Sequence, residues 1–486
     1  MTRKIINVFA LAIIFIGFGL RTYQLGNDSF WNDEAGQAIA AIQPTVGEML
    51  AIIRSHAMAM PFDYFVSRGT SIVGVMETIM RFPSVVWGTL TLALYFVFSK
   101  KLCQPKVALL TTWLLGLSAY HIHYSQEMRF YSALSFFYIL STLFLFRYIN
   151  QPSKLTWGLF IFTTSLGSYF HPYVLLSIVN GFLYIAIIYP PARINDKKLL
   201  ALVVSSITLG ITFLPGYLYF GADQNYAYDI FQYGGSLIQI LAYGLGWKVF
   251  PYTEISPTFG IWELLNIGFA GVGTIVVYTN YKYYKEFVSI IISVFIQIAL
   301  IILADWIKGY WFISRQIVHL MPIVMILTSI GVVGLVEYLS RPFKFSSVKN
   351  FAFVGVMIIF GLSAVPRLTD YYNFQKSNGR QIVSELIQKS KTTEPIFVIP
   401  GYEEKIYRFY LLQTTSSNDI IQELKPTSWE QLQYDTSKIP GDIYLITTAL
   451  MSDEQYNHLE LLGFTPLLQP EVGWHGSRLL LVRYQQ

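Results

Sequence analysis

Two adjacent carboxylic acids, Asp33 and Glu34, stand within about a dozen residues of the end of the first apolar segment. Acids held near a bilayer tend to have raised pKa values, because an apolar environment disfavours the charged form, and a raised pKa suits a general base. A purely structural interpretation also fits. Asn32 or Asp33 can cap a helix from Glu34 to Ile42, because acids are favoured in a first helical turn. Spacing alone leaves both interpretations open.

A second group of polar side chains lies in a short stretch between two hydrophobic segments: His121, His123, Glu127, Arg129 and Tyr131. Glu127 and Arg129 are two positions apart, so they point to different faces of a helix and serve different partners. Such groups are often interfacial anchors, but this density favours a polar cavity. His121 and His123 can bind a metal, yet no third ligand is suitably spaced, so we predict no metal site and no cofactor.

Arginines mark two further candidate positions. Arg315 and His319 are four residues apart, on one helix face near the outer leaflet, where the arginine fork can bind a lipid phosphate. Arg81 stands at the start of the second hydrophobic segment, in Arg81-Phe-Pro-Ser84. For both arginines the alternative is an interfacial anchor, with a buried stem and a head that reaches water.

The composition places these residues in a membrane protein. Of the 486 residues, 53% are hydrophobic and 13% are charged, about half the roughly 25% of a soluble domain. The 34 tyrosines and 10 tryptophans suit membrane–water interfaces. The net charge of +5 includes no dense Lys/Arg stripe, which argues against a nucleic-acid partner. The single cysteine, Cys103, excludes an intrachain disulfide.

Apolar runs long enough to cross about 30 Å of hydrocarbon recur along the chain. They predict about eleven transmembrane helices, at residues 5–22, 82–99, 107–120, 130–147, 155–171, 173–190, 199–220, 258–279, 287–304, 316–339 and 350–366. The first run follows Arg3 and Lys4 as in a signal peptide, but no small-residue cleavage site follows it, so we expect a retained helix. His171 lies in the tight hairpin between two of the runs.

Basic residues orient the predicted helices. With Met1 inside, the inner loops hold fifteen Lys and Arg in about 45 residues, and the outer loops hold eight in about 120. We therefore predict a multi-pass protein of the cell membrane with a cytoplasmic N-terminus. Eleven crossings then leave the C-terminal region outside. The first outer loop, residues 23–80, is the longest.

The composition changes near Asp370 and predicts a domain boundary, with a transmembrane domain at 1–369 and a separate domain at 370–486. Helical spacing appears at 379–390, 403–412 and 452–462, and strand patterns appear at 395–400, 442–447 and 478–484. This alternation predicts a small α/β domain on the extracytoplasmic side.

Five stretches together resemble the membrane glycosyltransferases of the C-type fold. They are Trp31-Asn-Asp33-Glu34-Ala35, Met60-Pro61-Phe-Asp63-Tyr64, Arg81-Phe-Pro-Ser84, Tyr124-Ser-Gln-Glu127-Met-Arg129-Phe-Tyr131, and Phe312-Ile-Ser-Arg315 ahead of Pro322. Their order and loop positions are similar to those of the dolichyl-phosphate-mannose protein mannosyltransferases and the bacterial lipid A aminoarabinose transferases. The resemblance covers about residues 1–340.

The resemblance implies transfer of a sugar from a polyprenyl-phosphate donor to a hydroxyl or amine acceptor at the outer face, with inversion. It puts the general base at Asp33, with Glu34 beside it to orient a substrate. Arg315 and Arg129 are candidates to stabilise the leaving phosphate, and Glu127 and Tyr131 to shape the sugar pocket. Further candidate substrate-binding residues are His56, Asp63, Tyr64, Arg81, His171 and His319.

The acceptor implied is a glycan, a lipid or a protein, and membrane lipids are further partners. Many relatives have a Pro-Pro-Leu-Tyr type of sequence where this chain has Pro61-Phe-Asp63-Tyr64, so the resemblance names neither sugar nor acceptor.

Two other classes of function compete. A transporter or lipid flippase would carry charged groups within its spans and show repeat symmetry, and neither is visible. A sensor would bind a ligand in the C-terminal domain and use the spans only as an anchor.

Overall fold

The computed structural model describes most of the chain and divides it into two compact units. The described residues are 2–55, 60–189, 196–220, 241–242, 244–245, 261–308, 314–342, 346–389, 394–414, 424–428, 432, 442–448, 454, 457, 459, 461, 464–468 and 477–483. The first unit comprises residues 1–23, 51–63 and 81–371, and the second comprises 24–50, 64–80 and 372–486. Each unit is described by itself below.

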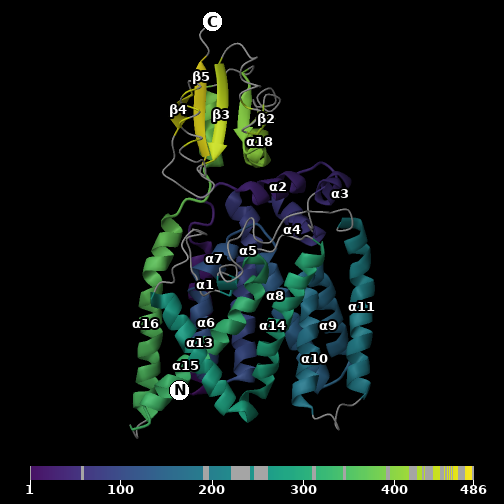
Figure 1. Cartoon of the computed structure of the whole chain (residues 1–486), viewed down its shortest axis with the longest axis vertical. Coiled ribbons are helices and arrows are strands. Elements are labelled where there is room, and N and C mark those ends of the chain that lie inside the picture. Colours follow the sequence, from purple (N-terminus) through teal and green to yellow (C-terminus); the bar gives the residue numbers. More distant parts are fainter. Residues whose placement is uncertain are drawn as a thin grey trace. The chain divides into compact units, whose positions relative to one another are not determined.

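Long apolar helices dominate the first unit (Figure 1). Within the described residues, eight helical segments are long and apolar enough to cross a membrane. The helices that form them are α1 (Arg3–Thr22), α5 (Glu77–Leu102), α8 (Tyr131–Asn150), α11 (Asp196–Phe220), α13 (Ile261–Thr279), α14 (Tyr281–Lys308), α15 (Met321–Leu339, preceded by the 3₁₀ helix η3, Ser314–Leu320) and α16 (Ser346–Asn373). They match eight of the predicted runs.

The other three predicted runs form shorter helices: α6 (Pro105–Gly116), α9 (Lys154–Ser168) and α10 (Ser177–Ile188), which follows the 3₁₀ helix η1 (Pro172–Leu176). At 1.5 Å per residue, α6 is only about 18 Å long. It ends early because Ser118 caps a separate short helix, α7 (Ala119–Ser125), through a hydrogen bond from the backbone N–H of His121 to Ser118 Oγ. The total of eleven crossings stays a prediction.

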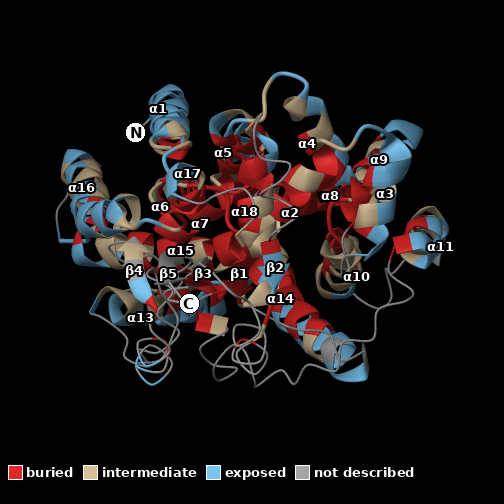
Figure 2. Ribbon diagram, turned by 90° about the horizontal axis from the view of Figure 1, so that it is seen from above, coloured by how far each residue is buried: buried red, intermediate tan, exposed pale blue. Residues whose placement is uncertain are grey.

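The helices of this unit differ in how much surface they bury. The span that contains α15 is 78% buried, whereas α13 and α16 are each 17% buried. The exposed faces of α1, α11 and α16 are apparent in Figure 2. The exposed side chains on α16 are large and apolar, among them Phe351, Ile358 and Leu362. Apolar faces of this kind are typical of contact with lipid.

Small residues allow two pairs of helices to approach closely. An added Cβ at Gly273 of α13 would clash with the Leu327 carbonyl of α15, and one at Gly331 of α15 would clash with the Phe269 carbonyl of α13. The two backbones therefore touch, as in other small-residue contacts between membrane helices. Trp113 of α6 donates a hydrogen bond from Nε1 to the Met357 carbonyl of α16 (2.8 Å), which fixes α16 against α6.

The second unit joins parts of the long first loop to the C-terminal residues. The loop supplies α2 (Asn32–Ala41) and parts of α3 (Val46–Ser55) and α4 (Pro61–Ser71). The C-terminal part supplies α17 (Gly379–Lys389), η4 (Gly401–Glu403), α18 (Glu404–Leu412) and a sheet of β1 (Ile396–Ile399), β2 (Leu424–Pro426), β3 (Asp442–Thr448), β4 (Thr465–Leu468) and β5 (Ser477–Arg483).

The strand order is β2-β1-β3-β5-β4, with β1 parallel to both neighbours and the β3–β5 and β5–β4 pairs antiparallel. The three predicted strands and the predicted helices at 379–390 and 403–412 are confirmed. Strands β2 and β4 were not predicted, because each is short and contains a proline. Within the predicted helix 452–462, residues 454, 457, 459 and 461 are helical, and the others lie outside the described residues.

The α13–α15 contact yields a first prediction. Replacing Gly273 with valine should force the two backbones apart and cost about 1–3 kcal/mol, the usual range for overpacking. The matched control is Gly271→Val on the same helix, where an added Cβ meets nothing within 4 Å. Thermal unfolding of both purified variants in detergent should show a lower Tm for Gly273→Val alone, and equal values would contradict the close contact.

Candidate active site

A buried arginine fixes the turn between α6 and α7 in the first unit. Arg21 was counted as an outer-loop cation in the sequence, but its side chain is 0% exposed. It donates from Nη2 to the Leu115 carbonyl (3.3 Å) and from Nη1 to the Gly116 carbonyl (3.3 Å), and so satisfies the end of α6. It also reaches into α7, donating from Nε to Ser125 Oγ (3.2 Å).

The contact between Arg21 and His121 affects the protonation state of the histidine ring. Burial, and then the Arg21 guanidinium, hold the pKa of His121 well below its usual range. His121 is therefore neutral at physiological pH, and its Nδ1 can accept the hydrogen bond from Arg21 Nη2 at 2.8 Å. This explains His121 as a positioning residue of the turn between α6 and α7.

The end of α7 carries an ion pair that holds Glu127. His123 Nε2 lies 3.0 Å from Glu127 Oε1, one helical turn away, and both side chains are buried. Gln126 is held separately, because its Nε2 donates to the Tyr23 carbonyl (2.8 Å) and its Oε1 accepts from Tyr371 Oη (2.6 Å). Gln126 and Glu127, which follow α7, are therefore each held by side-chain contacts.

Two arginines from distant parts of the sequence meet around neighbouring aromatic rings. Arg129 Cζ lies 5.1 Å from the ring centre of Phe130, and Arg315 Cζ lies 5.8 Å from the ring centre of Tyr131. The Phe130 and Tyr131 rings are themselves 4.5 Å apart. The structure therefore brings the candidate residues Arg129, Tyr131 and Arg315 around neighbouring rings and adds Phe130, which the sequence analysis had not singled out. Both arginines are half-buried.

The two predicted histidines extend this cluster. The His171 ring lies 4.7 Å from Phe130 and 4.5 Å from Tyr173, between ring centres, and Tyr173 lies 6.1 Å from His319. Burial, and then His319 and Arg129, lower the pKa of His171 to about 3, so it is neutral at physiological pH. His319 is fully buried. We call Arg129, Phe130, Tyr131, His171, Arg315 and His319 the arginine–histidine cluster.

The predicted residues Asp63, Tyr64 and Arg81 are also buried. Arg81 is 4% exposed, which contradicts the alternative of an interfacial anchor, because its head does not reach water. Asp63 is buried near the start of α4, and the N–H of Phe62 donates to the Tyr169 carbonyl (3.1 Å). Tyr64 is buried and belongs to the second unit. His56 lies outside the described residues.

The acidic pair lies in the first turn of α2, in the second unit. The N-cap of this helix is Trp31, so the expectation that Asn32 or Asp33 caps it is wrong. Instead, Glu34 Oε2 accepts from the N–H of Trp31 at 3.4 Å, and Glu34 is fully buried. Glu34 thus stabilises the start of the helix in the manner of a capping box. Asp33 takes no part in this cap and is only half-buried.

The C-terminal part of the second unit holds the segment just before Asp33. Tyr410 Oη accepts from the N–H of Phe30 (2.6 Å) and donates to Glu77 Oε1 (2.6 Å). Arg380 Nε lies 3.2 Å from the same Glu77 oxygen, so the charge of Glu77 is shared by two donors. The hydroxyl of Tyr410 therefore links α18 to both ends of the first loop.

Further bonds reinforce this connection, which we call the loop clamp. Arg380 Nη2 donates to the carbonyls of Gly26 (2.9 Å) and Asn27 (2.7 Å), and its backbone N–H donates to Ser29 Oγ (3.1 Å). Lys376 Nζ lies 4.5 Å from the centre of the Trp31 ring. The loop clamp comprises Lys376, Arg380 and Tyr410 on one side, and residues 26–31 and Glu77 on the other.

The described residues contain no group of three or more His, Cys, Asp or Glu side chains that could hold a metal ion. The candidate groups described above are guanidinium groups and imidazoles in the first unit and the carboxylate of Asp33 in the second.

Comparison with known proteins finds a matching family and several solved structures with the same fold. Residues 57–217 match the family described as dolichyl-phosphate-mannose-protein mannosyltransferase. The match covers 161 of the 486 residues, and the fold of the whole chain is shared with membrane glycosyltransferases of the C-type fold. The predicted resemblance and the multi-pass membrane architecture are thereby confirmed. No curated protein sequence matches the chain.

Solved structures with the same fold include ArnT from Cupriavidus metallidurans in the apo state. It shares 11% identity with a TM-score of 0.56, covering 98% of each chain. The same protein bound to undecaprenyl phosphate gives 10% identity and a TM-score of 0.51, covering 99% of this chain and 98% of that one. The archaeal oligosaccharyltransferase AglB from Archaeoglobus fulgidus gives 8% identity and a TM-score of 0.51, covering 90% of this chain and 69% of that one.

The role of Arg21 can be tested by its removal. Arg21→Met should leave the last carbonyls of α6 and the His121 ring without their donor, at a cost of about 2–4 kcal/mol, because hydrogen bonds to charged groups are among the strongest. The control is Arg3→Met, an exposed position on the same helix. A Tm of Arg21→Met equal to that of the control would contradict this anchoring role.

The loop clamp can be tested at Tyr410. Tyr410→Phe removes the hydroxyl that contacts Phe30 and Glu77, and should destabilise this part of the loop by about 1–3 kcal/mol. Hydrogen–deuterium exchange should therefore be about tenfold or more faster in residues 26–34. Tyr281→Phe, at an exposed tyrosine of α14, is the control for the chemical change. Unchanged exchange in Tyr410→Phe would show that the clamp does not hold the loop.

Proposed function

We propose that the chain transfers a sugar from a polyprenyl-phosphate donor to a hydroxyl or amine of an acceptor, with inversion at the anomeric carbon. The observation that carries the proposal is the arginine–histidine cluster, in which Arg129 and Arg315 lie against the neighbouring rings of Phe130 and Tyr131. The family match to residues 57–217 includes Arg129 and His171 of this cluster. It supports an activity of this class.

The arginines would stabilise the leaving group. As the bond between the anomeric carbon and the phosphate oxygen breaks, negative charge grows on the polyprenyl phosphate. Preorganised cations aimed at that charge lower the barrier, and a guanidinium fork suits a phosphate because it can donate two parallel hydrogen bonds. Half-burial of Arg129 and Arg315 strengthens this interaction by keeping water from part of each charge.

The carboxylate of Asp33 is the proposed general base. The acceptor oxygen or nitrogen attacks the anomeric carbon from the face opposite the phosphate, and its proton passes to Asp33 as the bond to phosphate breaks. The polyprenyl phosphate leaves with both bonding electrons. The configuration inverts because attack and departure occur on opposite faces of the anomeric carbon. Because Glu34 is committed to the start of α2, we assign it a positioning role: it fixes the turn that carries Asp33.

The sugar would contact polar groups in and beside the cluster. Glu127, Tyr131, His171 and His319 are proposed to line the sugar pocket, because carboxylate, hydroxyl and imidazole groups can hydrogen-bond a hydroxyl-rich ligand. The other proposed substrate-binding residues are His56, Asp63, Tyr64 and Arg81.

The relatives support the kind of partner. The ArnT structure was obtained with undecaprenyl phosphate, and the AglB structure with a dolichol-phosphate and an inhibitory peptide. A polyprenyl-phosphate donor is therefore proposed here, with a glycan, lipid or protein acceptor. The asymmetry of Lys and Arg supports a cytoplasmic N-terminus and an extracytoplasmic domain at 370–486, which puts the chemistry on the outer face.

The central test is removal of the base. Asp33→Asn keeps the size of the side chain but cannot accept the proton, so transfer from a polyprenyl-phosphate hexose should fall by about 10²–10⁴-fold. The control is Asp370→Asn, an exposed acid near the end of α16. Product formation is measured with purified protein in liposomes, and the anomeric configuration by NMR. Wild-type rates in Asp33→Asn would exclude Asp33 as the base, and retained configuration would exclude the direct displacement.

A further inference from the structure

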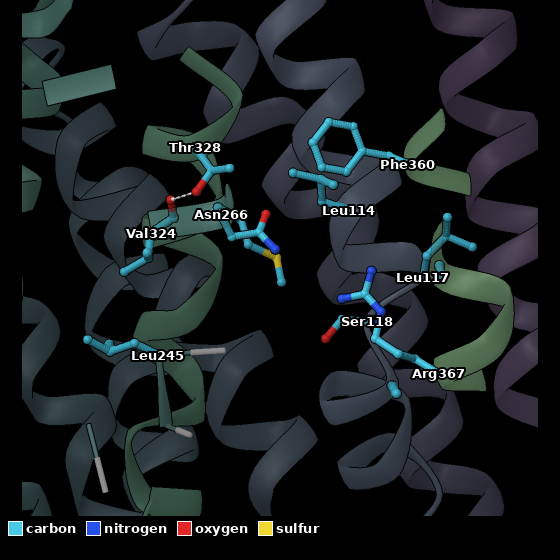
Figure 3. Close-up of a pocket in the computed structure, with 12 residues that line it drawn as sticks. Leu114, Leu117, Ser118, Leu245, Asn266, Val324, Thr328, Phe360 and Arg367 are labelled. Carbon is cyan, nitrogen blue, oxygen red and sulfur yellow. Dashed lines mark hydrogen bonds between the residues drawn. The ribbon is translucent and has the colours of Figure 1, made fainter. Parts of the chain in front are cut away.

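A small cavity opens between α6, α13, α15 and α16, at the start of α7 (Figure 3). Its volume is about 70 Å³. Leu114, Val324 and Phe360 contribute apolar walls, and Ser118, Asn266 and Arg367 contribute polar groups. The Arg367 guanidinium reaches into this space from α16, and Asn266 lies across it (Figure 3). An arginine in such surroundings calls for an explanation.

Arg367 is only partly satisfied by its own helix. Its Nε and Nη2 donate to the Ser363 carbonyl, at 3.3 and 3.1 Å, and its Cζ lies 5.7 Å from the ring centre of Trp262. Glu263 on α13 attracts the guanidinium electrostatically. No described carboxylate lies within the 4.0 Å of a salt bridge, and Nη1 has no hydrogen-bond partner among the described residues. The side chain is half-buried, so it does not extend fully to water as an interfacial anchor would.

The other polar groups of the cavity are also donors. The side-chain amide of Asn266 has no hydrogen-bond partner among the described residues. Ser118 Oγ accepts from the N–H of His121 (3.2 Å), which leaves its hydroxyl proton to donate. With Arg367, these groups offer three sources of N–H or O–H around one space. Such a set fits a ligand that is negatively charged and rich in acceptors, and a phosphate meets both requirements.

The surroundings indicate that this phosphate belongs to a lipid. Arg367 lies on α16 and Asn266 lies on α13. These two helices are the least buried of the candidate spans, with 17% of each span buried. Large apolar side chains cover their exposed faces, including Leu264 and Leu265 on α13 and Leu362 on α16. A free anion would have little water there, whereas a lipid tail can lie along these faces while its headgroup enters the cavity.

We propose that this cavity binds the phosphate of an anionic membrane phospholipid through Arg367, Asn266 and Ser118. The polyprenyl phosphate of the proposed reaction is assigned elsewhere, to Arg129 and Arg315, neither of which lines this cavity. The bound phospholipid would neutralise Arg367 and join α16 to α6, α13 and α15. It is a second lipid site, and its existence does not depend on the transfer activity.

Native mass spectrometry of the full chain from nanodiscs tests the proposal. The discs contain phosphatidylglycerol and phosphatidylcholine in equal amounts, and polyprenyl phosphate is added in a separate arm. Wild-type protein should retain phosphatidylglycerol over phosphatidylcholine by about tenfold, a usual effect of one charge-assisted contact. Arg367→Gln should lose this preference, Arg367→Lys should keep part of it, and Asn266→Leu should weaken it. Arg147→Gln, an exposed arginine near the end of α8, is the matched control.

Each outcome decides the question. Loss of the preference in Arg367→Gln but not in Arg147→Gln, with unchanged elution on size exclusion, supports the site. The same preference in wild type and Arg367→Gln overturns it, as does the absence of any retained phosphatidylglycerol. If only polyprenyl phosphate is retained through Arg367, the cavity belongs to the donor path and the proposal is wrong. If Arg367→Gln elutes as misfolded protein, Asn266→Leu decides in its place. Failure here leaves the Asp33→Asn result unaffected.

Discussion

The burial of the Arg21 guanidinium is the interaction on which the first unit depends. A charge in an apolar bundle is tolerated only where carbonyls and neutral polar groups surround it, and Arg21 finds them at the end of α6 and along α7. Its hydrogen bonds satisfy the last carbonyls of α6 and fix the direction of α7. The loop that follows α7 carries Glu127 and Arg129, so the contacts of Arg21 with α7 contribute to the position of this part of the site. The hydrogen bonds that offset the burial of the Arg21 charge thereby also fix α7 relative to α6.

Local chemistry was the part of the site that the sequence could predict. Glu127, Arg129 and Tyr131 are neighbours in the chain, and their density between two apolar runs was enough to mark them. The pairing with Arg315 came from resemblance and not from spacing, because 186 residues separate Arg129 from Arg315. Periodicity likewise predicted the long helices and the three longer strands, because each carries its own pattern. It missed β2 and β4, where a few residues and a proline give no pattern to detect.

The loop clamp could not be predicted, for a reason that is also physical. Tyr410 and Phe30 are 380 positions apart, and Arg380 and Gly26 are 354 apart. Nothing in either local sequence requires the other, since a tyrosine on an amphipathic helix is equally suited to a core or a surface. The sequence therefore suggested a separate domain from residue 370, whereas the structure joins residues 24–50 and 64–80 with the C-terminal residues in one compact unit.

This arrangement suggests how the two units divide the proposed reaction. The proposed stabilisation of the phosphate requires cations, and the first unit carries the half-buried Arg129 and Arg315. Removing a proton from an acceptor requires a carboxylate whose surroundings can differ from one acceptor to another. Asp33 lies on a loop that the C-terminal residues hold, so changes in that domain can alter the setting of the base without disturbing the arginines. Under this proposal, the C-terminal domain would influence which acceptor is used, and the membrane helices would bind the donor.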